Sequence, residues 1–137
     1  MNYDFVVIGS GFGGSVSALR LSEKGYKVAV IEQGKQVTPC DMLEAADDRK
    51  KLFWMPNIGL NGFFSQTVFK HFGIVGGVGV GGGSLVYAAV LLKPKKKFYK
   101  DPSWSNLGID WEKEMAPYYE KASNMLGIVK NPHFDKM

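Results

Sequence analysis

Cysteine is almost absent from this chain of 137 residues, which contains only Cys40. A single cysteine excludes an internal disulfide framework and a cysteine metal cluster, and it is typical of a reducing compartment. The two histidines, His71 and His133, lie far apart and have no carboxylate cluster at metal-ligand spacing, so we expect no metal site. No basic segment precedes the first apolar run, so no signal peptide is recognised, and we expect a cytoplasmic location.

Charge of one sign is not concentrated either. Seventeen Lys and Arg residues against 13 Asp and Glu residues give a net charge of +4, and 45% of the residues are hydrophobic. This composition is typical of a globular protein. The short basic run Lys93–Lys97 favours a solvated loop, and aromatic residues are not interleaved with basic ones, so we expect no nucleic-acid partner.

Hydrophobic periodicity predicts a βαβ unit at the start of the chain. The apolar run "YDFVVI" (Tyr3–Ile8) suits a strand buried on both faces, and "KVAVIE" (Lys27–Glu32) suits a second one. Between them, residues 13–25 change to a helical period and end at Gly25. Such a unit closes right-handed with its strands parallel, so we expect an α/β fold of the Rossmann type.

The turn between the first strand and the helix carries the pattern G-x-G-x-x-G in "GSGFGG" (Gly9–Gly14). In a dinucleotide site the first glycine allows a tight turn, the second lets backbone approach a pyrophosphate, and the third lets helix pack on strand. The helix N-terminus offers free N–H groups to the phosphates. Glu32 ends the second strand, where it can accept hydrogen bonds from an adenosine ribose and disfavour a 2′-phosphate. The sequence therefore predicts a dinucleotide site other than an NADP site.

A second glycine cluster lies inside a stretch from Phe72 to Leu92 that contains no charged residue. The length would suffice for a membrane span, but each glycine weakens a helix interior by about 1 kcal/mol relative to alanine. A flexible linker is disfavoured by the apolar neighbours. We therefore expect no transmembrane span but a buried loop along a ligand, followed by a helix over Ser84–Leu92 with Ser84 near its N-cap.

Weaker patterns describe the rest of the chain. We expect a helix over 41–52, a loop over 56–64, and one or two short strands over 65–75 around a turn near His71 to Gly73. A polar connection should follow over 93–108. The last element is a helix over 110–127, with Asp110 as N-cap, Gly127 as stop and a kink or new start at Pro117.

These residues carry a family resemblance. The stretch "YDFVVIGSGFGGSVSALRLSEKGYKVAVIEQGK", together with "GVGVGGGSLVYA", resembles the N-terminal part of glucose–methanol–choline type flavoprotein oxidoreductases, in particular the cholesterol oxidase-like branch. The segment "DPSWSNLGIDWEKEMAPYYEKASNMLGIV" resembles the family's entry into its substrate domain. The resemblance implies an incomplete Rossmann-like FAD-binding domain over 1–93 and the beginning of a substrate domain over 94–137.

The resemblance implies FAD as cofactor, and no histidine lies in "SLVYAAV" for a covalent link, so we expect non-covalent binding. It also implies an alcohol oxidoreductase that passes hydride from a CH–OH group to flavin N5, with a bulky apolar or sterol-like alcohol as substrate and oxygen or another acceptor. No catalytic residue is expected within this chain, whose partner would be the remainder of the enzyme. Alternatives are a NAD-dependent dehydrogenase and a non-catalytic nucleotide-binding module. The cofactor-binding residues that the resemblance implies are Gly9, Gly11, Phe12, Gly13, Gly14, Glu32, Gly81, Gly82, Gly83, Ser84, Tyr87 and Ala88.

Overall fold

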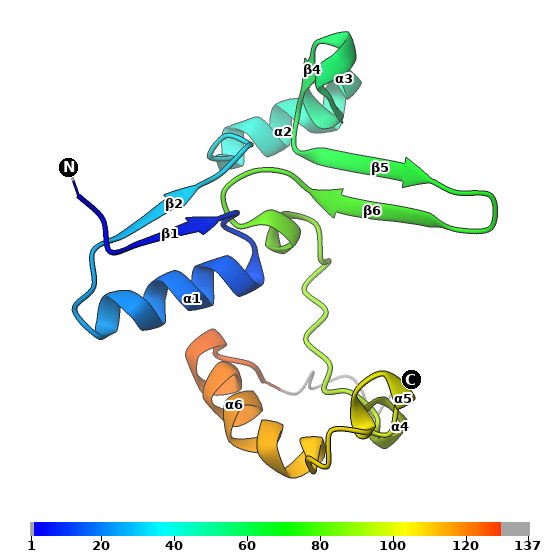
Figure 1. The fold of residues 1–137 in the computed structure, drawn as a ribbon. Coiled ribbons are helices and arrows are strands. Elements are labelled where there is room, and N and C mark those ends of the chain that lie inside the picture. Colours follow the sequence, from blue (N-terminus) through cyan, green and yellow to red (C-terminus); the bar gives the residue numbers. More distant parts are fainter. Residues whose placement is uncertain (1, 130–137) are drawn as a thin grey trace. The chain divides into compact units, whose positions relative to one another are not determined.

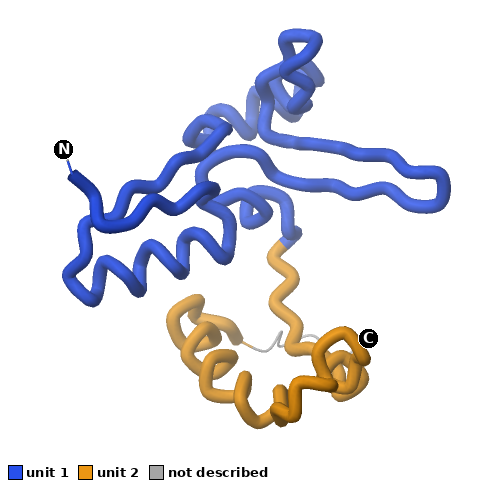
Figure 2. The backbone as a smooth tube through the Cα atoms, viewed as in Figure 1, with its two compact units in different colours: residues 1–88 blue, residues 89–137 orange. Residues whose placement is uncertain are grey.

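The computed structural model describes residues 2–129, so His133 and the last part of the expected second segment lie outside the described residues. Contacts divide the chain into two compact units, Met1–Ala88 and Ala89–Met137 (Figure 2). The first unit holds the predicted βαβ element, a β-hairpin and both glycine clusters (Figure 1). The second unit is helical in the part that the structure describes.

The predicted βαβ unit is confirmed. Strand β1 (Phe5–Ile8) leads through the first glycine turn into helix α1 (Phe12–Glu23), and the chain returns in strand β2 (Val28–Ile31). The two strands are parallel, with Phe5 opposite Val28 and Ile8 opposite Ile31. The helix ends next to Gly25, whose φ of +89° lies in the left-handed region that glycine adopts readily. This is the α/β arrangement of a Rossmann-like start.

Burial of these strands on both faces was a wrong prediction for the residues that the structure describes. Ile8 is 87% exposed and Ile31 is 58% exposed. The reason is that β1 and β2 form a two-stranded sheet, in which no further described strand lies beside them, and α1 is the helix that packs on them. The described neighbours of β1 and β2 therefore leave part of the strands' apolar side chains exposed.

The segment after β2 contains more regular structure than the sequence indicated. The expected helix over 41–52 is divided at Asp48, which has an extended backbone and whose side chain accepts a hydrogen bond from the backbone N–H of Lys50 at 2.8 Å. The expected loop over 56–64 contributes a 3-10 turn and a strand to a small antiparallel pair. The elements are α2 (Pro39–Asp47), α3 (Arg49–Leu52), β3 (Trp54–Met55), η1 (Pro56–Ile58) and β4 (Leu60–Asn61).

The predicted short strands before the second glycine cluster are confirmed as a hairpin. Strand β5 (Phe64–Val68) pairs antiparallel with β6 (Gly73–Gly77) (Figure 1). At the turn, the rings of Phe69 and Phe72 stack with centroids 4.7 Å apart, and the Phe69 N–H donates to the Phe72 carbonyl. The hairpin delivers the chain from β6 into the second glycine cluster.

The helix expected over Ser84–Leu92 is wrong. The chain forms a single 3-10 turn, η2 (Gly82–Leu85), and then leaves helical geometry. The Ser84 hydroxyl donates to the carbonyl of Gly81 at 2.9 Å, so it does not cap a helix. Ala88 and Ala89 have φ of 55° and 54°, a left-handed conformation that ends any right-handed helix and costs free energy at residues other than glycine.

The second unit contains α4 (Lys96–Tyr99), α5 (Pro102–Ser105) and α6 (Trp111–Leu126). The expected polar connection thus includes two single-turn helices. Helix α6 confirms the predicted ends, because the Asp110 side chain accepts from the Lys113 N–H and Gly127 has a φ of +62°. The new start expected at Pro117 is absent, since α6 runs through it as one helix, and the alternative of a kink there stays a prediction. Searching residues 2–129 finds no helix that is both long and apolar enough to cross a membrane.

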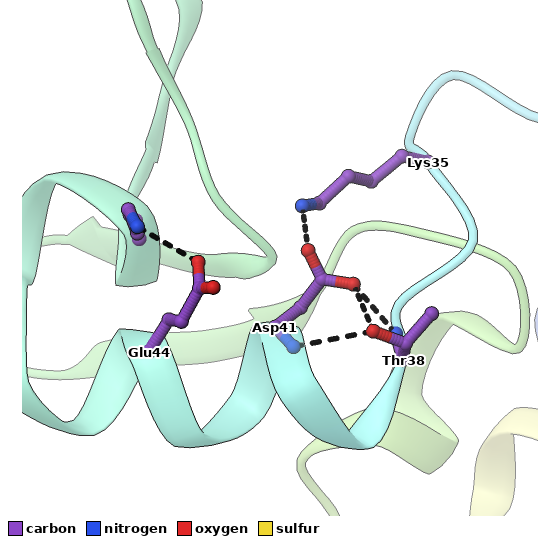
Figure 3. Close-up of polar contacts among 5 residues, drawn as sticks. Lys35, Thr38, Asp41 and Glu44 are labelled. Atoms are coloured by element: carbon purple, nitrogen blue, oxygen red, sulfur yellow. Dashed lines mark hydrogen bonds and ion pairs between the residues drawn. The ribbon is translucent and has the colours of Figure 1, made fainter.

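Helix α2 begins with a capping box next to the loop that follows β2 (Figure 3). The Thr38 hydroxyl accepts from the Asp41 N–H at 3.2 Å, and the Asp41 carboxylate accepts from the Thr38 N–H at 2.8 Å. Lys35 makes an ion pair with the same carboxylate. Hydrogen bonds from Lys35 and Thr38 hold the pKa of Asp41 well below its usual range. The box fixes how the chain turns from β2 into α2.

Replacing the cap tests this local order. We expect Thr38→Ala to lower the free energy of unfolding by about 1 kcal/mol, because an N-terminal N–H of α2 loses its partner. Thr38→Ser keeps the hydroxyl and should remain close to wild type. Chemical denaturation of the full-length protein, meaning the longest reading frame that contains this chain, measures both. Equal stability of Thr38→Ala and wild type would contradict the assigned cap.

Candidate functional site

The first glycine loop presents free backbone N–H groups at the start of α1. Gly9 leaves β1 with a φ of +88°, and its N–H donates to the carbonyl of Ile31 at 2.7 Å, which ties the loop to the end of β2. Gly11 is the N-cap residue, and no side chain caps the helix there. The partial positive charge of the helix N-terminus is therefore available to an anion.

The glycines of this loop divide into two kinds. A Cβ atom built on Gly9, Gly11 or Gly13 would meet no atom within 4 Å, whereas one built on Gly14 would lie 1.9 Å from the carbonyl oxygen of Gly9. Gly14 is thus needed for the packing of α1 on β1. The other three leave open space beside the free N–H groups. This matches the separate duties that a dinucleotide-binding turn assigns to its glycines.

The second glycine cluster lies directly against the first loop. A Cβ atom on Gly82 would lie 2.8 Å from the Cα atom of Gly11, and the Gly81 N–H donates to the hydroxyl of Ser10 at 3.1 Å. Gly83 lies over the ring of Phe12, where a Cβ atom would come within 3.2 Å of a ring carbon. The two backbones therefore meet at a distance that side chains would prevent.

The same cluster also contacts the chain after β2. A Cβ atom on Gly34 would lie 2.5 Å from the nitrogen of Gly79, and the Val80 N–H donates to the carbonyl of Lys35 at 3.1 Å. Gly79 is buried and has a φ of +148°. Burial of the expected loop is thus confined to Val78 and Gly79, whereas residues 80–87 are half-buried or exposed. Its contacts in the structure are backbone segments on both sides of Glu32.

Glu32 lies between these segments and is half-buried. Its Oε2 accepts from the N–H of Ser10 at 2.8 Å and from the Ser10 hydroxyl at 2.7 Å, and its Oε1 accepts from the Gly34 N–H at 3.0 Å. These donors, with the backbone bond from Ser10 as the largest contribution, lower the pKa of Glu32 below its ordinary value of 4.5. The carboxylate is therefore charged at neutral pH and already holds the first loop.

The structure brings most of the expected cofactor-binding residues together. The first loop, Glu32 and the turn at Gly81–Gly83 meet around Ser10, and the ring of Tyr87 packs edge-on against Phe12 with centroids 6.1 Å apart. Ser84 follows in the 3-10 turn, and Ala88 ends the first unit in left-handed geometry. Ser10 itself was missed, because it stands at a variable position of the glycine pattern. Its small polar side chain between two glycines was the available signal.

A dinucleotide fits this arrangement better than a metal ion does. Uncapped N–H groups beside open space suit the phosphates, and an ionised carboxylate at the end of β2 suits a ribose. In the part of the chain that the structure describes, no group of three His, Cys, Asp or Glu side chains could hold a metal ion. Cys40 is exposed and takes no part in the site.

Comparison with known proteins decides the family. Residues 4–40 match the family model "FAD binding domain", and 97% of the chain is 44% identical to a cholesterol oxidase of Mycobacterium tuberculosis and 42% identical to one of Acinetobacter baumannii. The chain belongs to the cholesterol oxidase-like, FAD-dependent oxidoreductases. It spans about a quarter of the length of these relatives, 23% and 24% respectively.

Two relatives with lower sequence identity act on other alcohols according to their names. A long-chain-alcohol oxidase of Arabidopsis thaliana is 31% identical over 93% of this chain, and a 2-methyl-1,2-propanediol dehydrogenase of Mycolicibacterium austroafricanum is 33% identical over 91%. The chain covers 16% and 24% of these two relatives. The names have an alcohol substrate class in common. The matched family model names FAD as the cofactor and covers the first glycine loop and Glu32.

Two neighbouring glycines provide a matched test of the packing assigned above. We expect Gly14→Ala to lower the free energy of unfolding by about 2 kcal/mol, because its Cβ overlaps the carbonyl oxygen of Gly9. We expect Gly13→Ala to raise it by about 0.5–1 kcal/mol, since alanine favours the helix and meets no neighbour. Denaturation of the full-length protein without cofactor measures both. Equal effects would refute the division of the glycines.

The lowered pKa of Glu32 predicts a loss of stability in acid. A carboxylate whose pKa is depressed by folding stabilises the protein above its ordinary value of 4.5, and this contribution disappears as the pH falls through the lower folded value. Glu32→Gln should therefore be less stable than wild type at pH 7, and the difference should shrink as the pH falls below about 5. Thermal unfolding across this range measures it. If the difference in stability between Glu32→Gln and wild type did not depend on pH, the charge of Glu32 would not contribute to stability.

Proposed function

We propose that this chain is the FAD-binding part of an alcohol oxidoreductase. When bound, FAD supplies a flavin that accepts hydride at N5 from a CH–OH group. The observation that supports the proposal most directly is the meeting of two glycine loops around free N–H groups, open space and the Glu32 carboxylate. A cofactor with a long pyrophosphate-linked body makes use of both loops. The alternative of a nicotinamide dehydrogenase leaves the second loop without a use.

The first loop would bind the pyrophosphate. Its residues from Gly9 to Gly14, Phe12 and Gly13 included, would donate N–H groups and leave room for phosphate oxygens, and Glu32 would accept hydrogen bonds from the adenosine ribose. The absence of histidine between Ser84 and Val90 supports non-covalent binding. No residue of this chain is assigned a catalytic proton transfer. The chain's work is to bind and orient the cofactor.

The second loop would lie along the pyrophosphate and the flavin. Gly81–Gly83 and Ser84 are placed beside Gly11, so N–H groups of the turn can face the same ligand as the first loop. Tyr87, which packs on Phe12, and Ala88 would continue toward the flavin side. Preorganised N–H donors of this kind favour negative charge that develops on a bound group.

The substrate would be a bulky apolar, sterol-like alcohol, with oxygen or another acceptor completing the reaction. This part of the proposal is supported by the names of the relatives, which include cholesterol oxidases and long-chain-alcohol oxidases. Residues 1–93 would form the FAD-binding part, and 94–137 would begin a substrate domain within the remainder of the enzyme. The exposed free thiol of Cys40 supports a reducing, cytoplasmic location.

A visible absorption spectrum tests the proposal. The full-length protein, incubated with FAD and freed of unbound ligand, should retain the absorption bands of oxidised flavin. The variant Gly11→Ala separates binding from folding. Its added Cβ atom enters open space in the protein, so the fold should stay intact, but it would occupy the proposed phosphate position. We expect this variant to keep its unfolding temperature without cofactor and to bind FAD about tenfold or more weakly. Binding of NAD in place of FAD would refute the proposal.

A further inference from the structure

Ser10 occupies the point where the three backbone segments of the site meet. Among residues 2–129 it is the only buried polar side chain, with 7% of the residue exposed. Its hydroxyl contacts both the Glu32 carboxylate, at 2.7 Å, and the backbone nitrogen of Gly81, at 3.1 Å. One atom therefore connects residues that are distant along the chain. The proposed function above assigns it no role.

Chemistry fixes the direction of both hydrogen bonds. The Gly81 N–H can only donate, and an ionised carboxylate can only accept, so the Ser10 hydroxyl must accept from Gly81 and donate to Glu32. The result is a short chain of hydrogen bonds that ends on a charge. Each bond in such a chain polarises the next and strengthens it. The Glu32 charge thus acts on the second loop through one hydroxyl group.

Ser10 is itself held firmly. Its N–H donates to Glu32 at 2.8 Å, and its carbonyl accepts from the hydroxyl of Ser15 at 2.6 Å. The second loop has two other backbone anchors, the bonds from the Val78 N–H to the carbonyl of Phe63 and from the Val80 N–H to the carbonyl of Lys35. Neither of these hydrogen bonds joins the first glycine loop to the second.

We propose that Ser10 is a positioning residue whose hydroxyl bridges the two glycine loops and holds them in one arrangement before FAD binds. The inference rests on the proposed function, since it deepens the account of the same cofactor site. Without the hydroxyl, the half-buried Gly81 N–H loses its partner and the second loop must be ordered by the cofactor itself. Ordering a segment during binding weakens affinity, whereas a preorganised site avoids that cost.

Amide exchange and FAD affinity in serine variants test the bridge. In the full-length protein without cofactor, Ser10→Ala should speed hydrogen exchange at the Gly81 N–H about tenfold or more and weaken FAD binding to a similar extent. Ser10→Cys, which keeps the volume but bonds weakly, should lie in between, and Ser10→Thr, which keeps the hydroxyl, should restore both values. Ser17→Ala is the matched control: it removes an exposed hydroxyl on α1 and should leave exchange at Gly81 unchanged.

The outcomes are distinguishable. Wild-type exchange at Gly81 and wild-type affinity in both Ser10→Ala and Ser10→Cys would overturn the bridge. Faster exchange spread equally over the β5–β6 hairpin would also overturn it, because it would show a general loss of stability. If Ser10→Ala does not fold, Ser10→Cys carries the test. Failure of the wild-type protein to bind FAD would refute the proposed function, while exchange without cofactor would still decide whether the bridge exists.

Discussion

The close approach of two stretches of backbone governs the architecture of the first unit. Gly82 lies against Gly11, and Gly79 lies against Gly34, at distances where a Cβ atom would overlap its neighbour. Both contacts therefore depend on glycine itself, and hydrogen bonds accepted by the Ser10 hydroxyl and the Lys35 carbonyl accompany them. The βαβ unit, the turn after β2 and the end of the β5–β6 hairpin are joined at this place. The proposed cofactor site is the surface that this junction leaves open.

The charge on Glu32 stabilises the junction from within. Its carboxylate receives the N–H groups of Ser10 and Gly34 and the hydroxyl of Ser10. An acidic residue at the end of a second strand is usually considered for its ribose contact. Here it also organises the backbone around it. Through these hydrogen bonds the carboxylate gives the proposed site its shape without a ligand.

Much of this could be predicted from the sequence, because local patterns carry it. The two short apolar runs, the helical period over residues 13–25 and the spacing of Gly9, Gly11 and Gly14 define the βαβ unit, and the structure confirms it. The hairpin before the second cluster followed from apolar runs around His71. Contacts between distant glycines could not be read, since a glycine pattern does not say whether ligand or protein backbone approaches it.

The failures have physical reasons too. Ser84 resembled an N-cap, but its hydroxyl bonds back to Gly81, and Ala88 and Ala89 adopt left-handed conformations that propensity does not indicate. Burial of β1 and β2 was inferred from their composition, whereas burial depends on neighbours that a short segment cannot reveal. Ser10 was overlooked because its importance comes from Gly81, far along the chain.

The separation of these partners in the sequence sets the order in which the site is made. Ser10 and Glu32 are 22 residues apart, whereas Ser10 and Gly81 are 71 apart. Closing the longer loop costs more chain entropy, and contacts of large separation slow folding. During synthesis the contact of Ser10 with Glu32 can therefore form soon after β2 emerges from the ribosome. The contact of Ser10 with Gly81 must await the hairpin, so a nascent chain passes through a stage in which the first glycine loop is formed and the second is not.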